Sequence, residues 1–245
     1  MLRLCDSGRM TAPHRQRLQI DERRTQLVAL GTKLFAKRPY DDVSIDDIAA
    51  EAGISKGLLY HYFGSKRALY VETVREASMQ LRARVEPDLS LSPAERARTG
   101  LEGYLGFVEE HAESFAALMR SGVGNDPEVA AVVDETRDAI IAQMMTTMGV
   151  DAARPIVRFV LRSWIGLVEA ASLDWLARDK QVPRDVVVRM LIESLGASVM
   201  IATRLDPDSG LRVDAPQARA PEAAPTPAAT KRAGRNAPAR ARTKR

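Results

Sequence analysis

Residues 54–66 read ISKGLLYHYFGSK, and they predict a short helix that begins after Ser55. Lys56 and Tyr60 are one helical turn apart, and Gly57 and His61 form the adjacent pair, so these four residues share one face of the helix. A glycine on an outer helix face lets the backbone approach another surface closely, as the floor of a DNA major groove requires. The stretch therefore predicts a helix that presents its polar face to a second molecule.

Two helix starts in this region carry cations where acids are usual. Lys56 follows Ser55, and Lys66 and Arg67 follow Ser65. The N-terminus of a helix has partial positive charge, and an added lysine makes it a site for anions, of which phosphate is bound best. The contact surface is therefore suited to nucleic acid.

The preceding segment completes a helix-turn-helix. A helix is expected after Ser44, because Asp47 three residues later is typical of a capping box, and Gly53 is expected to end it. Only Gly53 and Ile54 separate it from the helix described above, which is the tight connection of a helix-turn-helix. Flanking helices are expected over 21–37 and from Ser65 to near residue 87.

The remaining sequence also has helical periodicity, to about residue 204, and no sustained alternation of period two. The predicted fold class is therefore all-α. Helices are expected over 93–111, 112–121, 126–149, 151–179 and 183–204, with a loop at SGVGNDP. The last two are apolar over more than one stripe, which predicts burial on two sides.

Charge is distributed unevenly along the 245 residues. The whole chain carries +4, but residues 215–245 hold eight basic side chains against one acid, a net +7, which leaves −3 for the first 214 residues. Because this end is rich in Ala, Pro and Arg and has no large apolar side chain, we expect 206–245 to be a disordered basic tail. Residues 1–20 are expected to be a disordered arm.

Several functional classes find no support in the sequence. Cys5 has no cysteine partner, and no apolar run is long enough for a membrane span or a signal peptide, so a cytoplasmic protein without membrane contact is expected. His14, His61 and His111 lie in no metal-binding or catalytic motif. We therefore expect no enzyme activity, catalytic residue, bound metal or cofactor.

The run LFAKRPYDDVSIDDIAAEAGISKGLLYHYFGSKRALY, residues 34–70, resembles the DNA-binding domain of TetR-type transcriptional regulators, and the resemblance extends over about fifty residues. It implies a homodimer that binds a palindromic operator in double-stranded DNA, usually as a repressor. It also implies a helix-turn-helix domain over 21–68 and a helical domain over 69–205 for dimerisation and for a small-molecule effector of unknown identity. Carried over by position, the DNA-binding residues are Ser44, Ser55, Lys56, Gly57, Leu58, Tyr60, His61, Tyr62 and Lys66.

The C-terminal half offers a candidate pocket for a small apolar or amphipathic effector, although the same side chains are also typical of plain core. The candidates are Tyr104, Phe107, Phe115, Met119, Met144, Met145, Met148 and Trp164. Arg158 and Arg162 are candidates for an anchor of an acidic effector, for an ion pair across a dimer, or for a solvated face. The competing function is a non-specific nucleic-acid packaging protein that binds through the basic tail.

Overall fold

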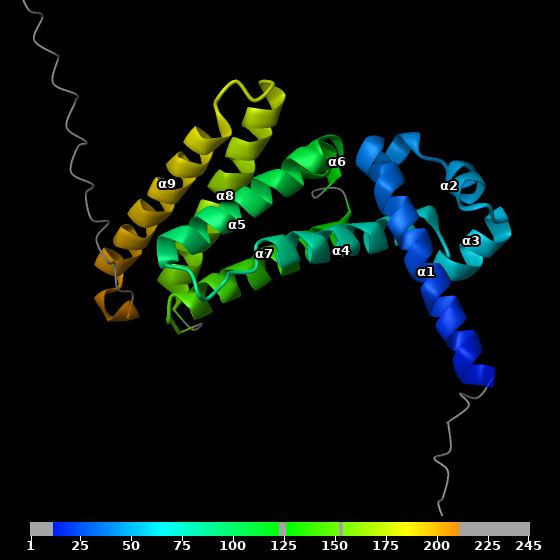
Figure 1. The fold of residues 1–245 in the computed structure, drawn as a ribbon, viewed down its shortest axis with the longest axis horizontal. Coiled ribbons are helices and arrows are strands. Elements are labelled where there is room, and N and C mark those ends of the chain that lie inside the picture. The colour runs from blue at the N-terminus through cyan, green and yellow to red at the C-terminus, as the bar shows by residue number, and fades with distance from the viewer. Residues whose placement is uncertain (1–11, 123–125, 152–153, 211–245) are drawn as a thin grey trace, which may run out of the picture. The chain divides into compact units, whose positions relative to one another are not determined.

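The computed structural model of the protein describes residues 12–122, 126–151 and 154–210, and these residues contain helices but no strand, which confirms the all-α prediction. The helices are α1 (Ala12–Lys37), α2 (Ile45–Ala52), α3 (Lys56–Phe63), α4 (Lys66–Arg84), α5 (Pro93–Glu110), α6 (Ala112–Ala117), α7 (Pro127–Thr147), α8 (Pro155–Ala177) and α9 (Arg184–Leu205) (Figure 1). Short turns of other helix types cover Tyr40–Asp42, Leu118–Gly122 and Pro207–Ser209.

Local sequence signals set the ends of the short helices. The Ser44 hydroxyl accepts a hydrogen bond from the Asp47 amide at 3.0 Å, and the Asp47 carboxylate accepts one from the Ser44 amide at 3.0 Å. This is the predicted capping box. Gly53 ends α2 in the left-handed region with φ of 63°, a conformation that glycine adopts without steric cost. Ser55 and Ser65 cap α3 and α4 in the same way as Ser44 caps α2.

Three expected boundaries were wrong. The helix expected from Asp21 begins at Ala12, because Pro13 is tolerated in a first turn and good helix formers follow it. The helix expected from Asp151 begins at Pro155, where proline suits the first helical position. The expected tail begins too early, because Asp206 pairs with Arg154 at 3.3 Å and a helical turn follows; residues 211–245 lie outside the described part.

The described residues belong to one compact unit, and α4 is shared between its N-terminal and C-terminal parts. This helix packs against α1 on one side and α7 on another, so the expected domain boundary at 68/69 falls inside a continuous helix. Leu27, Ile48 and Leu59 lie in the N-terminal core. Leu105 and Leu161 lie in the core that α5, α7, α8 and α9 share.

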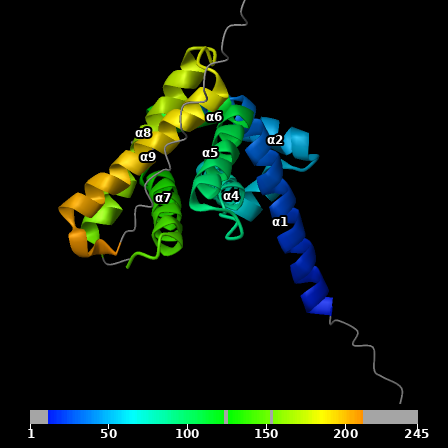
Figure 2. The same ribbon diagram turned by 60° about the vertical axis from the view of Figure 1, so that its left-hand side comes forward.

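Helices α8 and α9 lie side by side in both Figure 1 and Figure 2. Each buries one side, yet large apolar side chains remain exposed on the pair: Phe159, Leu167, Val186, Met190, Met200, Ile201 and Leu205. Phe159 is 73% exposed. Among the described helices, α9 is the one whose length and composition would allow it to cross a membrane. The sequence predicted burial of α8 and α9 on two sides, but a single chain buries only one side of each helix.

Candidate DNA-binding surface and effector cavity

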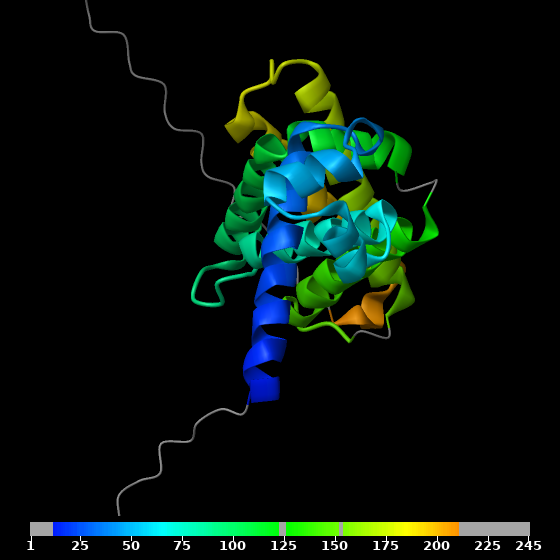
Figure 3. The same ribbon diagram turned by 90° about the vertical axis from the view of Figure 1, so that its right-hand side faces the viewer.

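Helix α3 has the two-faced character that its sequence predicts. Leu59 and Phe63 are buried in the N-terminal core, whereas Lys56, Gly57 and His61 are exposed. Apart from its chain neighbours and the backbone of its own helix, no atom of the described residues lies within 4 Å of a Cβ built on Gly57, so no other described residue fills the space beside it. Figure 3 shows α2 and α3, in light blue and cyan, on the side of the molecule that faces the viewer. The exposed face of α3 is thus open to a partner.

The lysines of this surface already have intramolecular partners. Lys56 pairs with Asp46 at 2.9 Å, and this hydrogen bond raises the pKa of the ammonium group. Both side chains are at least half exposed, so the pair is weak and a DNA phosphate can compete for the lysine. The Lys66 ammonium lies 4.0 Å from the centre of the Tyr40 ring, which itself contacts Tyr70. These contacts hold the two cations at the surface beside α3.

The other predicted DNA-binding residues differ in exposure. Leu58 and Tyr60 are exposed on α3. Ser44 and Ser55 are exposed too, but their hydroxyls serve as helix caps. Tyr62 is half-buried and packs against the N-terminal core. Contacts of these residues with DNA stay predictions, and Tyr62 has less free surface for one than Leu58 and Tyr60.

Arg67 has a partner that the sequence did not indicate. Its guanidinium donates to the two carboxylate oxygens of Asp126 at 2.6 and 2.8 Å, and it pairs with Glu128 at 3.0 Å. Asp126 also caps α7, accepting from the Glu128 amide at 3.0 Å. The hydrogen bonds from Arg67, together with the capping bonds, lower the pKa of Asp126 to about 2. The start of α4 is thereby tied to the start of α7.

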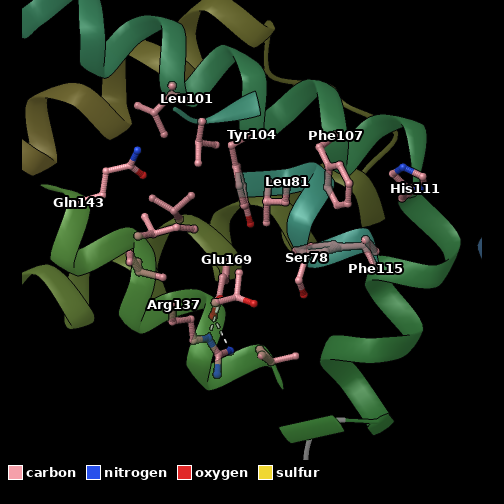
Figure 4. Close-up of a pocket in the computed structure, with 18 of the residues that line it drawn as sticks. Ser78, Leu81, Leu101, Tyr104, Phe107, His111, Phe115, Arg137, Gln143 and Glu169 are labelled. Carbon is pink, nitrogen blue, oxygen red and sulfur yellow. Dashed lines mark hydrogen bonds and ion pairs between the residues drawn. The ribbon is translucent and has the colours of Figure 1, made fainter. Parts of the chain in front are cut away.

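A cavity of about 310 Å³ lies in the C-terminal part, with a wall formed by α1, α4, α5, α6, α7, α8 and, at Leu195, α9 (Figure 4). Seven predicted effector residues line it: Tyr104, Phe107, Phe115, Met119, Met144, Met148 and Trp164. Met145 does not; it is 1% exposed and belongs to the core. His111 also lines the cavity, and burial lowers the pKa of its imidazole. The volume is at the lower end of the roughly 300–1,000 Å³ typical of ligand pockets.

Arg158 and Arg162, the candidates for an anchor of an acidic effector, do not line this cavity. They pair with Asp138 at 2.7 Å and Asp134 at 2.9 Å, and both arginine side chains are at least 40% exposed. The cavity reaches α8 only at Trp164 and beyond, so the two arginines lie too early in the helix to line it. Their position fits the solvated face that the sequence left open.

The cavity wall contains a different arginine, Arg137, which sequence reasoning missed. Its guanidinium donates two hydrogen bonds to Glu169, both 2.8 Å long (Figure 4). It donates a third to Asp134 at 2.9 Å. The Arg137 and Glu169 side chains are only 15% and 16% exposed. Burial alone would lower the pKa of Arg137, but the hydrogen bonds that it donates to Glu169 and the attraction of that carboxylate outweigh burial and raise the pKa. No periodicity in the sequence pointed to Arg137.

Comparison with known proteins identifies the family. Residues 27–73 match "Bacterial regulatory proteins, tetR family", and residues 93–198 match "Tetracyclin repressor-like, C-terminal domain". A solved tetR-family transcriptional regulator from Streptomyces coelicolor is 34% identical, covers 78% of this chain and 86% of its own, and superposes with a TM-score of 0.71. The chain belongs to the TetR family. It is therefore a DNA-binding transcriptional regulator and not an enzyme.

Two curated relatives of this TetR-family regulator are similar over more than half of the chain. The transcriptional activator FasR of Mycolicibacterium smegmatis is 27% identical over 183 residues, which span 72% of this chain and 83% of the relative. The transcriptional regulator EthR of Mycobacterium tuberculosis is 29% identical over 152 residues, which span 54% of this chain and 67% of the relative. Family membership favours a regulator over the competing packaging protein.

Proposed function

We propose that this TetR-family protein is a homodimeric repressor that binds a palindromic operator and releases it when a small effector occupies the cavity. The observation that carries the proposal is the placement of α4. This helix begins with Lys66 beside the exposed face of α3, and further along it Tyr70, Val74 and Leu81 line the cavity. One rigid element thus touches both sites, so a ligand that shifts α4 also shifts the DNA-binding surface.

The N-terminal part also contacts the cavity directly. Thr32, Phe35 and Ala36 of α1 contribute to its wall. A ligand in the cavity therefore touches two helices that position α2 and α3. Coupling between two such sites is typically about 1–3 kcal/mol, which corresponds to a change in operator affinity of about five- to 150-fold.

The exposed apolar surface of α8 and α9 supports the dimer. Phe159, Met190 and Ile201 are 47–73% exposed on these two helices. Monomeric soluble proteins rarely expose a large apolar patch, and two such helix pairs can form a four-helix interface around a two-fold axis. A two-fold dimer places two copies of α3 on DNA, so its operator consists of inverted half-sites.

The regulatory direction follows from the release mechanism. When effector binding lowers operator affinity, transcription blocked by the bound dimer resumes, which is repression with induction. FasR is named an activator, so a relative of similar sequence acts in the opposite direction. A reporter gene placed behind the selected operator separates the two: deletion of the regulator raises expression for a repressor and lowers it for an activator.

Selection of bound fragments from random DNA tests the core of the proposal. The expected product is one preferred site with two inverted half-sites, occupied by two protomers in a mass measurement of the complex. Phe159→Asp places a charge in the proposed interface and is expected to shift the protein towards monomers and to weaken operator binding. Absence of a preferred site, or tight binding of a single protomer, contradicts the proposal.

A further inference from the structure

Helix α5 presents two buried polar groups to the cavity that have no hydrogen-bond partner within the described part of the chain. They are the Nε atom of Arg96 and the hydroxyl of Tyr104. Both residues line the cavity, whose other walls are mainly apolar. A buried donor without a partner costs free energy, so two such donors facing one cavity indicate that a bound molecule supplies the acceptors.

Arg96 lacks an ion-pair partner among the described residues as well. The neighbouring acid, Glu95, is engaged in the cap of α5, where it accepts from the Ser92 amide at 3.0 Å and from the Ser92 hydroxyl at 2.6 Å. An arginine is charged at every physiological pH and has five N–H donors but no acceptor. A guanidinium partly buried in an apolar wall is therefore stabilised most by an anion.

Arg137, the second arginine in the cavity wall, is not available to pair with an anionic ligand. Three of its donor groups are engaged by Glu169 and Asp134, as described above. An anionic ligand placed there would meet the Glu169 carboxylate, which lines the same wall. The free positive charge of the cavity therefore belongs to Arg96.

Tyr104 marks a second polar position along the same helix. Burial raises the pKa of its hydroxyl, so the group stays a neutral donor. The Ser172 hydroxyl lies close enough to act against this rise, and it donates its own proton to the Val168 carbonyl at 2.7 Å. No hydrogen bond of normal geometry joins the hydroxyls of Tyr104 and Ser172, so the Tyr104 donor remains available to a ligand. In Figure 4 the Tyr104 hydroxyl points from α5 towards the Arg137–Glu169 pair. Eight residues separate Arg96 from Tyr104, about 12 Å along a helix, so one extended molecule can reach both.

We propose that the effector is an extended amphipathic monocarboxylate. Its carboxylate pairs with Arg96, and its apolar body passes Tyr104 towards Phe107 and Phe115. The Tyr104 hydroxyl donates to an acceptor within that body, such as a keto group. This proposal rests on the proposed effector site, and it names the chemistry that the site selects.

Isothermal titration of the full-length protein with decanoate and with 1-decanol tests the role of the charge. The two probes share a chain length and differ in the carboxylate, so decanoate is expected to bind about tenfold more tightly, the size of a charge-assisted hydrogen bond. Arg96→Met should abolish this preference. The matched control is Arg98→Met, because Arg98 is exposed and pairs with Glu102 at 3.6 Å; it should keep the preference.

The melting temperature gives an independent measure of Arg96. Removing a partly buried charge that has no ion-pair partner among the described residues is expected to leave the ligand-free protein equally or more stable, so Arg96→Met should not lower the melting temperature. For Tyr104, a series of oxododecanoate isomers should contain one that binds more tightly than dodecanoate, and Tyr104→Phe should remove that advantage.

Three results overturn the proposal: equal affinity of the wild type for decanoate and 1-decanol, no binding of either probe, or a preference for decanoate that survives Arg96→Met. Operator affinity, measured with and without decanoate, tests the proposed function separately. Binding through Arg96 without any change in operator affinity supports the carboxylate site and contradicts effector control. Intact operator binding together with failed decanoate binding contradicts the carboxylate site alone.

Discussion

Two glycines, Gly57 and Gly103, are expected to respond to substitution with opposite signs, because their surroundings differ. Beyond its own helix, a Cβ on Gly57 meets no described atom within 4 Å, whereas a Cβ on Gly103 overlaps the backbone oxygen of Arg84. Gly57→Ala should therefore stabilise the protein by about 0.5 kcal/mol, since glycine is a poor helix former and the site is in a first turn. Gly103→Ala should destabilise it by about 1–2 kcal/mol, because overpacking against a backbone outweighs the propensity gain.

Operator affinity should respond in the opposite order: substitution of Gly57 should lower it, whereas substitution of Gly103 should not. Gly57→Leu fills the space through which α3 approaches the groove, so operator affinity should fall about ten- to 100-fold, the size of a lost pair of base contacts. Gly103→Ala is far along the chain from α3 and should leave operator affinity nearly unchanged in the folded fraction. Urea denaturation at one fixed protomer concentration measures stability, and fluorescence anisotropy with the selected operator measures affinity. Wild-type affinity of Gly57→Leu, or a loss of stability in Gly57→Ala above 1 kcal/mol, refutes the reasoning.

Further predictions concern charged groups and the tail. Lys66→Ala should weaken binding to all DNA sequences alike and lower the salt slope by about one per protomer; a changed site preference in repeated selection would show that Lys66 reads bases. Glu169→Leu should destabilise the protein by about 2–3 kcal/mol, less than for a fully buried pair because Arg137 is 15% exposed and keeps a second acid. Adding Arg137→Met to Glu169→Leu should recover most of the lost stability in urea denaturation. A double variant that is no more stable than Glu169→Leu alone contradicts this expectation. The pKa of Asp126 is lowered from 3.8 to about 2, so its contribution to stability is complete above about pH 4 and is lost as the pH falls towards 2. The stability of Asp126→Asn should therefore change less than that of the wild type between about pH 4 and about pH 2 in acid unfolding. Identical unfolding curves for the variant and the wild type contradict this role of Asp126. A chain that ends at Asp214 should protect the same operator with weaker non-specific binding and a shallower salt slope, and an unchanged slope contradicts a role for the tail.

The sequence alone determined the features that depend on neighbours three or four residues apart. Ser44, Ser55 and Ser65 act as caps because each hydroxyl accepts from an amide three residues later. Gly53 ends α2 because its backbone adopts a conformation that few other residues reach. The aromatic side chains of Tyr104 and Phe107 were candidates for a pocket or for plain core, and both line the cavity. Such signals are local, and they act before any tertiary contact forms.

Only the tertiary structure decided which charges meet. The Arg67–Asp126 and Arg137–Glu169 pairs join residues that are 59 and 32 positions apart in the chain. Their geometry depends on how α4 and α8 are rotated and shifted against α7, and every helix pair allows several such arrangements with the same apolar pattern. The sequence singled out Arg158 and not Arg137, yet packing placed Arg158 at the exposed surface and Arg137 in the cavity wall. For the same reason Arg96 was identified as a cavity cation without an ion-pair partner among the described residues only once Glu95 had been placed in the cap of α5 and Glu169 beside Arg137.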